Sequence, residues 1–520
     1  MKDYTMTILF LVFSILYLPI TSFADKQPSS PTINFQYIQS LAENLAKKTY
    51  TPNIIQKSDK FGKSFKQRVQ IQYKWDKGLW KKEGSPFYIA FMPITEKFDT
   101  QVNLYEVDDG KAKKIKFNAD NFDYGTSGVK PDQMPKAFSG FRIVSSKDNK
   151  DILIFQGGSY FRPIPPECSL GLSLRALTIN TVIDGAEEEF PDFTDFLLVN
   201  PKDESGVLKF YALLNSNSVA GAYEFTLNYD KEMTIEVRST IILKNSVAEL
   251  GFAPITSQFW YGENSHINFK QARPEVHNSD GLIMKGNNVH YWNSLANYID
   301  KPALNSYNHF KSLDYFGLLQ RDRNFANYAD LLAYYNLNPN VWINIDKKKN
   351  TGNVRLVILP TKTQYTDNVN TFWITDKKPE VGKPFDFNYT VNTSLNEPSQ
   401  STANVNHFWE GLFKSSVYNN KGYFFSVSFS DGELSNIYSK AKITPNISII
   451  GPAKVSGTPI VTYCKDINSW IASFYVKPDN KNALTKAINI KCYLTLDNKA
   501  VTETWSYFWY PVRSQSVKYQ

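Results

Sequence analysis

The chain has 520 residues, a net charge of +8, and lysines that are interspersed with acids along its whole length. Nucleic-acid binding requires a basic stripe on one face, and no such cluster is present, so we expect no nucleic-acid partner. Three cysteines cannot build a disulfide framework; Cys464 and Cys492, both in predicted strands, are candidates for one bridge in an oxidising compartment, which would leave Cys168 unpaired.

The first 24 residues have the pattern of a removable secretory signal. Lys2 precedes an apolar run over residues 8–20, which is too short to span a bilayer comfortably, and Ser22 and Ala24 offer a cleavage site. An uncleaved membrane anchor is the alternative. No arginine pair precedes the run, so general secretion is favoured over the twin-arginine route. No later run has the length of a membrane helix, and we expect residues 25–520 to form a soluble protein.

Most of the following chain is predicted to be β-structure. Residues 35–48 come first and carry apolar side chains at helical spacing (Phe35, Ile38, Leu41 and Leu45), which predicts one amphipathic helix. From residue 65 onward, short alternating runs are separated by Gly, Pro, Asn and Asp clusters, a rhythm that predicts an all-β domain. The runs lie at residues 69–73, 87–91, 151–155, 207–214, 233–243, 354–359 and 370–374.

A short helix and a domain boundary are expected further along. Residues 325–335 carry apolar side chains at helical spacing, which predicts a helix that ends before Pro339. The segment 396–403 is polar and lacks apolar periodicity, as is typical of a linker between residues 25–395 and 404–520. The last part carries about seven short alternating runs, which is typical of an immunoglobulin-like sandwich.

Three polar segments interrupt the apolar runs and are the main functional signal. They are residues 273–284, 320–323 and 365–368. The first of them contains Arg273, Glu275, His277 and Asp280 within eight residues. Charges set between apolar strands are costly to desolvate unless they pair or act on a ligand. Together the three segments predict one polar cleft.

The residue types in these segments favour carboxylate chemistry. The five histidines are scattered, without an HExxH motif or a Cys/His cluster, so we expect no metal and no cofactor. Glycoside hydrolysis uses one protonated and one ionised carboxyl group, and Asp280 and Asp367 both lie in polar breaks beside apolar runs. Each could instead be a turn residue that bonds its own backbone. Asp322 is interpreted as an acid that positions Arg321 and Arg323 through salt bridges.

Several longer strings of residues make the chain resemble one known protein family. The strings occur in the family's order and cover most of residues 60–395. They are Gly158-Ser-Tyr-Phe-Arg162, Gly171-Leu-Ser-Leu-Arg175, Glu188-Glu-Phe-Pro191, Val219-Ala-Gly-Ala-Tyr223, Leu250–Ser257, Arg273–Leu282, Phe316–Phe325, Thr366-Asp-Asn368 and Phe372-Trp373. On these strings the chain resembles the periplasmic glucan biosynthesis proteins G and D of Gram-negative bacteria. Local similarity in the last part of the chain is much weaker.

The resemblance implies a fold, a location and an activity. It implies a large N-terminal β-sandwich like that of galactose mutarotase, joined to a small C-terminal immunoglobulin-like β-sandwich, and a periplasmic protein. It also implies a cleft for osmoregulated periplasmic glucan, a β-1,2-linked glucose polymer. Some members look like inverting β-1,2-glucanases or transglycosylases; in that scheme Asp280 serves as general base and Asp367 as general acid. The G-type member fits better than the D-type, because the signal lacks twin arginines.

The chain departs from the family pattern in three segments. The family has an acid where Asn278 precedes the Ser-Asp-Gly segment. It also carries Asp-Leu-Glu-Ala and Arg-Pro-Ser where this chain has Asp330-Leu-Leu-Ala333 and Asn338-Pro-Asn340. The substitutions at Leu332 and Asn338 remove a glutamate and an arginine, and so change the groups available for substrate positioning and loop closure.

The sequence is therefore compatible with two alternative functions. The first is a periplasmic glycoside hydrolase or transglycosylase that tailors β-1,2-glucan. The second is a non-catalytic protein that binds nascent glucan and presents it to a membrane synthase. Residues expected to bind the sugar in either case are Tyr160, Arg162, Arg273, Glu275, His277, Trp292, Arg321 and Arg323.

Overall fold

The structure is a computed structural model that describes residues 31–55, 64–202, 205–230, 232–265, 271–286, 289–297, 302–308, 312–346, 351–398, 402–415, 420–437 and 442–511. The predicted signal segment lies outside these ranges. Within them, no helix combines the length and the apolar character needed to cross a membrane. The chain is dominated by β-strands, as the alternating runs predict, and the all-β fold class is confirmed.

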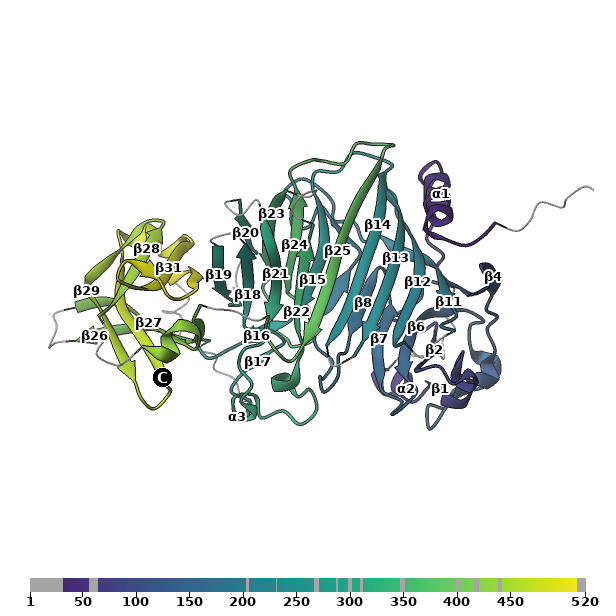
Figure 1. Ribbon diagram of the computed structural model, residues 1–520, viewed down its shortest axis with the longest axis horizontal. Coiled ribbons are helices and arrows are strands. Elements are labelled where there is room, and N and C mark those ends of the chain that lie inside the picture. Colours follow the sequence, from purple (N-terminus) through teal and green to yellow (C-terminus); the bar gives the residue numbers. More distant parts are fainter. Residues whose placement is uncertain are drawn as a thin grey trace, which may run out of the picture.

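Two large sheets face each other and form the large sandwich (Figure 1). In the described residues, the first sheet is ten-stranded and contains β2 (Phe87–Pro93), β6 (Phe138–Ser145), β7 (Asp151–Gln156), β8 (Tyr160–Pro163), β9 (Ser173–Arg175), β10 (Leu177–Ile179), β15 (Leu250–Ser257), β24 (Val369–Thr375), β23 (Gly352–Ile358) and β20 (Ala303–Tyr307). The part of the second sheet that faces it contains β19 (Val289–Ser294), β18 (Gly281–Gly286), β21 (Leu313–Leu319), β22 (Asn340–Ile345), β25 (Pro384–Ser394), β14 (Met233–Leu243), β13 (Val219–Tyr229), β12 (Val207–Asn215), β11 (Asp192–Val199), β3 (Asn103–Asp108) and β4 (Lys111–Lys114).

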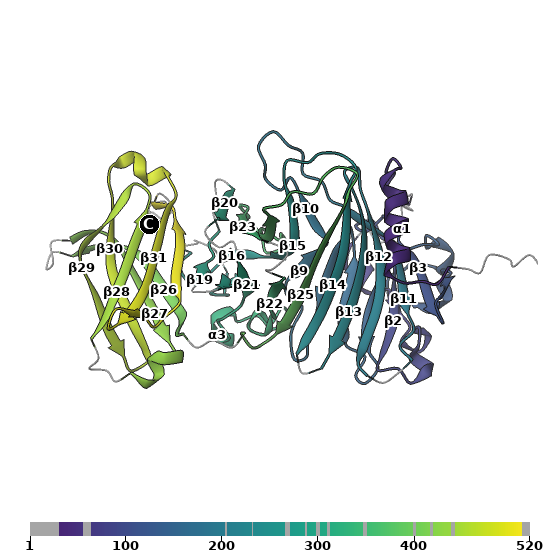
Figure 2. The same cartoon turned by 45° about the horizontal axis from the view of Figure 1, so that its top comes forward.

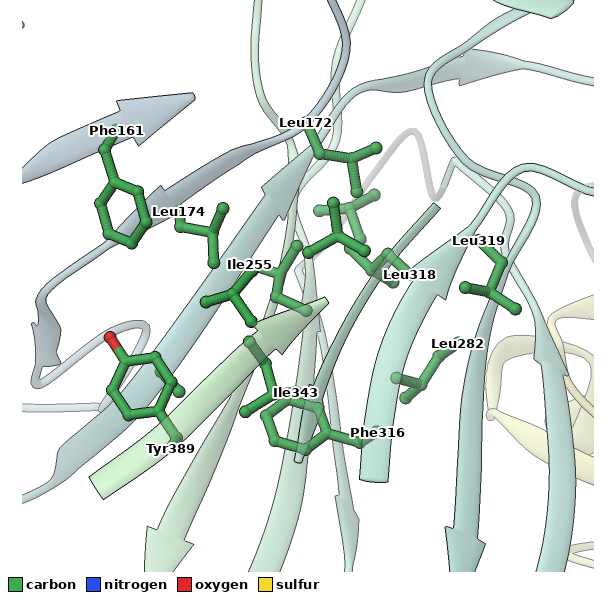
Figure 3. Close-up of a cluster of buried hydrophobic side chains, with 14 of the residues drawn as sticks. Phe161, Leu172, Leu174, Ile255, Leu282, Phe316, Leu318, Leu319, Ile343 and Tyr389 are labelled. Carbon is green, nitrogen blue, oxygen red and sulfur yellow. The ribbon is translucent and has the colours of Figure 1, made fainter. Parts of the chain in front are cut away.

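Aromatic side chains fill the space between the two sheets. Phe155 of the first sheet lies 5.4 Å, between ring centroids, from both Phe210 and Phe225 of the second. Figure 3 shows the aliphatic part of the same core, where Ile255 and Ile343 come from opposite sheets. The high aromatic content of the sequence is thus explained largely by the core, since each ring buries a large apolar surface.

The predicted first helix is confirmed as α1 (Phe35–Ala46). Its N-cap is Asn34, whose side chain accepts the backbone N–H of Tyr37 at 2.9 Å. Phe35 and Ile38 are buried against Tyr211 and other residues of β11–β13. Figure 2 shows α1 lying on the outer face of this sheet, which explains why one side of a surface helix is apolar.

Two predicted elements are wrong in extent. Residues 65–69 form the short helix α2 (Phe65–Val69), and only Gln72–Tyr73 form a strand, β1, which pairs with β5 (Phe122–Asp123). The helix predicted over 325–335 ends early, as α3 (Phe325–Tyr328). Ala329 adopts a left-handed conformation with φ of 49°, and the Asp330 carboxylate accepts the backbone N–H groups of Leu332 and Ala333, which competes with helix formation.

The C-terminal part forms the predicted small sandwich. One sheet contains β26 (Asn404–Ser415), β27 (Asn420–Ser430), β30 (Ser469–Pro478) and β29 (Ala453–Cys464). The other contains β28 (Ile443–Ile450), β31 (Ile488–Leu496), β32 (Lys499–Ala500) and β33 (Thr504–Trp509). The large sandwich ends with β25 at Ser394 and the small one begins with β26 at Asn404, on either side of the predicted linker.

The two sandwiches share one continuous sheet. Strand β33 pairs in parallel with β19, with Trp505 opposite Trp292, so the hydrogen-bonded ladder runs from the small sandwich into the large one. The indole N–H of Trp505 also donates to Ser294 Oγ at 3.1 Å. The junction between the sandwiches is therefore a packed interface, and Figure 1 shows it at the β18–β19 end of the large sandwich.

The predicted disulfide is absent, and this prediction is wrong. Cys464 ends β29 opposite Ser469, whereas Cys492 lies in β31 between Ile447 and Trp505. The two strands belong to different sheets, and all three cysteines are free. Cys492 is fully buried, and burial raises the pKa of its thiol, so it acts as an apolar core residue.

Candidate functional site

A cavity lies where the large sandwich meets the small one. It holds about 1120 Å³ of free space, including the part that is open to solvent. The wall from the large sandwich includes Trp260, Glu263, Glu275, His277, Asp280 and Asp322. The opposite wall, from the small sandwich, includes Asn406, His407, Phe408, Glu410, Tyr507 and Tyr510. We call this space the junction cavity. Its mixture of carboxylates, amides and aromatic rings is the mixture that protein pockets use for polar ligands.

Four side chains of the junction cavity and its floor form one hydrogen-bonded group, the Asp280 cluster: Glu275, His277, Asp280 and Gln320. The short hairpin β16 (Phe259–Tyr261) and β17 (Val276–His277) places His277 against the ring of Phe259, with 4.9 Å between centroids. His277 Nε2 lies 2.8 Å from Glu275 Oε2. Its Nδ1 lies 3.0 Å from Gln320 Oε1 and 3.3 Å from Asp280 Oδ1.

These contacts require a doubly protonated His277. The side-chain amide nitrogen of Gln320 donates to the carbonyl oxygen of His277 and to the Tyr328 hydroxyl, so its Oε1 must face the imidazole as an acceptor. Glu275 presents only acceptor oxygens when ionised. In a neutral imidazole one ring nitrogen has no proton, and its lone pair would face the acceptor oxygen of either Gln320 or Glu275.

The pKa values follow from the same contacts. Burial works to lower the pKa of His277, but the hydrogen bond to Glu275 and the charges of Asp280 and Glu275 outweigh it and raise this pKa to about 9. Burial raises the pKa of Asp280 to about 6, against the opposing effects of the His277 charge and the Asp322 N–H. At neutral pH the cluster therefore pairs an imidazolium with an ionised but weakly acidic carboxylate.

The backbone of the second polar segment completes the surroundings of Asp280. The N–H groups of Arg321 and Asp322 both donate to Asp280 Oδ2, the second at 2.7 Å. Strand β18 begins at the next residue, Gly281, where a Cβ atom would lie 2.3 Å from the Trp292 ring. Only glycine fits there without displacing the ring, so Gly281 serves the close packing of β18 against Trp292.

Trp292 lines the junction cavity and Arg321 does not, but protein groups inside the junction hold both side chains. The guanidinium of Arg321 lies 3.6 Å from the Trp292 ring centroid and donates to Glu397, Glu503 and the carbonyl oxygen of Val405. Both side chains are buried. Their contacts support a structural role between the two sandwiches, and their predicted role in sugar binding stays a prediction.

Arg323 and Arg273 are likewise occupied by protein groups. Arg323 donates to the carbonyl oxygens of Asn336, Asn338 and Leu395, which holds the loop before β22. Arg273 donates to Asp330 and to Gln364 at 2.7 Å each. It therefore connects the first polar segment to the loop that contains Leu332 and Asn338, and to the loop of the third polar segment, residues 365–368. Asp322, predicted to pair with the arginines, instead accepts from Asn324 and Asn327.

Asp367 belongs to a second polar group on β8 and β9. It pairs with Arg162 at 3.6 Å, and its side chain is 32% exposed. Nearby, the Arg175 guanidinium lies 4.7 Å from the Tyr160 ring and pairs with Glu188 at 3.8 Å. Asp367 is not among the residues that line the junction cavity.

One residue connects the two groups. Asn368, next to Asp367, accepts the backbone N–H of Phe259 at 2.8 Å, and Phe259 stacks on His277. The structure thus brings Glu275, His277 and Asp280 together, and separately Tyr160, Arg162 and Asp367. That the two aspartates act on one substrate stays a prediction.

Two of the three departures from the family pattern face each other. The side-chain amide of Asn338 donates to Asn278 Oδ1 at 3.1 Å and its own Oδ1 accepts from Ser169 Oγ at 2.7 Å. A neutral amide pair therefore stands where the family resemblance implies an acid beside an arginine. Leu332, the third departure, is 97% exposed and takes no part in this contact.

Sequence reasoning missed several residues of the site. Gln320 was inside a recognised polar segment but carries no charge, and Glu503 lies in the C-terminal part without any polar motif around it. His407 and Glu263 pair at 3.5 Å across the junction, a contact between residues 144 positions apart in numbering that no local pattern marks. Among the residues the structure describes, no group of three or more His, Cys, Asp or Glu side chains is arranged to hold a metal ion.

Comparisons with known proteins agree with the motifs. The sequence model of the family described as "Periplasmic glucan biosynthesis protein, MdoG" matches residues 33–509. "Probable glucans biosynthesis protein D" of Shewanella oneidensis is 33% identical over 503 residues, which cover 93% of this chain and 90% of that protein. "Glucans biosynthesis protein D" of Xanthomonas axonopodis pv. citri is 34% identical over 459 residues, covering 86% of this chain and 84% of the relative. Both relatives carry the D name, and the G-type assignment stays a prediction.

Proposed function

Because the chain belongs to the periplasmic glucan biosynthesis protein family, MdoG, we propose that it acts in the periplasm on a β-1,2-linked glucan, as an inverting glucanase or transglycosylase. The observation that carries the proposal is the state of Asp280. Its carboxylate lines a cavity, has a pKa of about 6, and is held by an imidazolium and two backbone N–H groups. A carboxylate with this pKa is ionised at neutral pH yet basic enough to accept a proton.

The proposed reaction assigns one role to each aspartate. Asp367 donates a proton to the glycosidic oxygen as the bond to the anomeric carbon breaks. Asp280, directly or through a hydrogen-bonded chain, accepts the proton of the water or sugar hydroxyl that attacks the opposite face, and the configuration inverts. Inversion requires the two carboxyl groups to be roughly 6.5–9.5 Å apart around the bound sugar.

His277 and Glu275 support this chemistry without touching the reacting bond. The imidazolium fixes one oxygen of Asp280 and keeps the carboxylate ionised, while Glu275 keeps the imidazole protonated. Arg162 holds Asp367 beside Tyr160, whose partly exposed ring is suited to a sugar face. Removing either aspartate should therefore stop turnover while leaving much of the sugar contact intact.

A second candidate is a non-catalytic glucan-binding protein that presents nascent polymer to a membrane synthase. The observation that favours it is the position of Asp367, which pairs with Arg162 outside the lining of the cavity that holds Asp280. A polymer could then contact both groups without one linkage lying between them. Binding without turnover is the result that would select this function.

Product analysis after incubation with linear β-1,2-glucan separates these functions. The mature chain is mixed with the polymer and the products are examined by mass spectrometry; shorter chains indicate hydrolysis, longer or cyclic chains indicate transfer, and unchanged polymer with measurable affinity indicates binding alone. Asp280→Asn and Asp367→Asn should each lower turnover by at least about 10³-fold, since each removes a group that moves a proton in the transition state.

Matched controls are available in the same sandwich. Asp151 pairs with Arg142 at 3.3 Å and is 27% exposed, which closely matches the Asp367–Arg162 pair. Asp195 is a partly buried carboxyl whose pKa is raised mainly by burial, as for Asp280, but it lies on β11. Asp151→Asn and Asp195→Asn should keep wild-type turnover. Full activity in both Asp280→Asn and Asp367→Asn would defeat the catalytic assignment.

A further inference from the structure

Arg321 connects the Asp280 cluster to the small sandwich. Its backbone N–H donates to Asp280 Oδ2, while its side chain extends the other way into the junction. There the guanidinium donates through Nε to both oxygens of Glu397 at 3.1 Å, and through Nη2 to Glu503 Oε2 at 3.2 Å, with Nη1 on the other Glu503 oxygen. One residue thus touches the cluster with its backbone and the small sandwich with its side chain.

Glu503 is the fixed point of this connection. Its side chain has no exposed surface and also accepts the backbone N–H of Val405, at 2.6 Å, where β26 begins. His290 Nε2 lies 3.3 Å away. Burial, with the charges of Lys285 and Arg321, lowers the pKa of His290 to about 3, so this imidazole is neutral. Arg321 is therefore the cation that balances the charge of Glu503.

The residues on either side of Arg321, in the segment 320–323, bond only to groups of the large sandwich. Gln320 donates to Tyr328 and to the carbonyl oxygen of His277, and Arg323 donates to the loop before β22. These contacts fix the two sides of Arg321 but do not reach the small sandwich. The forked pair with Glu503, which lies 182 positions away in the sequence, adds that anchor.

We propose that Glu503 is a positioning residue for Asp280, and that the small sandwich is thereby an integral part of the site. The inference rests on the proposed function, because it treats Asp280 as the base of the reaction. A buried arginine held by a forked carboxylate has one geometry, and that geometry aims the N–H groups of Arg321 and Asp322 at Asp280. The other ionisable groups that face Asp280 are Glu275, His277, Asp322, Arg323, Tyr328 and His407.

Glu503→Asp tests the geometry without changing the charge. The shorter side chain withdraws the carboxylate by one methylene group, so the fork on Arg321 opens and the two N–H donors shift from Asp280. A carboxylate that loses N–H donors is protonated at higher pH. The acid limb of kcat/KM on β-1,2-glucan should therefore move up by about half a pH unit, which roughly halves the ionised fraction of Asp280 at pH 6.

Val476→Ala is the matched control for general weakening of the small sandwich. Val476 is fully buried in β30, in the core of that sandwich, and has none of the contacts described for Arg321. It should lower stability and leave the acid limb in place. If Glu503→Asp does not fold, Arg321→Lys serves instead: it keeps the backbone N–H and the charge, but one ammonium group cannot reproduce the two-sided fork.

A second readout does not depend on turnover. In protein labelled with ¹³C at histidine Cε1, the five histidines give few signals, and His277→Gln identifies the one that matters. The N–H hydrogens near Asp280 carry partial positive charge, so their displacement makes protonation of His277 easier. Its titration midpoint should move to higher pH in Glu503→Asp and stay in place in Val476→Ala.

The two readouts separate the two proposals. A shifted His277 titration in a protein that never acts on glucan supports the positioning role and rejects the proposed function. If the protein acts on glucan but Glu503→Asp changes neither the acid limb of kcat/KM nor the titration of His277, the positioning role is rejected. Equal shifts in Glu503→Asp and Val476→Ala also reject it, because general loosening would then explain both.

Discussion

The protonation of His277 should make the stability of the large sandwich depend on pH. The folded protein raises the pKa of this imidazole from 6.5 to about 9, a difference that corresponds to about 3 kcal/mol. A group whose pKa is raised on folding stabilises fully below its unfolded pKa and loses that effect as pH rises through the folded value. The contribution of His277 should therefore be present at pH 6.5 and largely gone above pH 9.

Urea unfolding of the wild type and of His277→Gln, at pH 6.5 and at pH 9.5, measures this contribution. Groups outside the Asp280 cluster also titrate over this range, and their contributions cancel in the difference between the two proteins at each pH. We expect that difference to be about 3 kcal/mol larger at pH 6.5 than at pH 9.5. His290→Gln is the matched control, since folded His290 is largely buried but its pKa of about 3 leaves it neutral at both pH values.

One result would refute this reasoning. If the free-energy difference between wild type and His277→Gln is the same at both pH values, the imidazole carries the same charge in the folded and unfolded chain across this range. The requirement for two ring protons, drawn from the fixed orientation of Gln320 and the carboxylate of Glu275, would then be mistaken. A pH-dependent difference in His290→Gln of similar size would show that the effect is not specific to the cluster.

Three further predictions follow from single contacts. On glucan, kcat/KM should rise with pH through a limb near 6 as Asp280 ionises, and a profile that is flat between pH 5 and 7 would contradict its role as base. Asn278→Asp places a negative charge close to the cluster and should move that limb to higher pH. Adding Asn338→Arg should bring the limb back, because the two side chains are in contact at 3.1 Å. Equal limbs in the single and double variants would contradict this pairing. Ala329→Gly should raise the thermal unfolding temperature by an amount equivalent to up to about 1 kcal/mol, because it relieves a left-handed backbone, and a fall would show that the Ala329 side chain packs usefully.

The local pattern of apolar residues determined the fold class. Alternation with a period of two is a property of neighbouring residues, and the runs at 87–91, 151–155, 207–214 and 233–243 all form strands. The helix at 35–48 was equally visible, since a helical stripe depends only on spacing. The helix predicted over 325–335 was too long. The apolar spacing there comes from two buried tyrosines, Tyr328 and Tyr335, but between them the Asp330 carboxylate accepts backbone N–H groups and ends the helix.

The candidate site was located by sequence, but its internal contacts were not. Charges between apolar runs marked Glu275, His277 and Asp280, which the fold does bring together. The same argument marked Arg321, yet the arginine faces the small sandwich, and nothing near Glu503 in the sequence identifies it as the partner. A motif shows that a charge must be compensated, but the motif alone does not identify the compensating group.

The sequence by itself therefore determined the strands, the first helix and the positions of the polar segments, because each depends on residues a few positions apart. Only the tertiary structure decided which way each charged side chain points and which cysteines stay apart. An ion pair forms wherever packing brings two buried charges within contact, and Arg321 and Glu503 meet because β33 pairs with β19. That pairing depends on the whole chain folding around one continuous sheet.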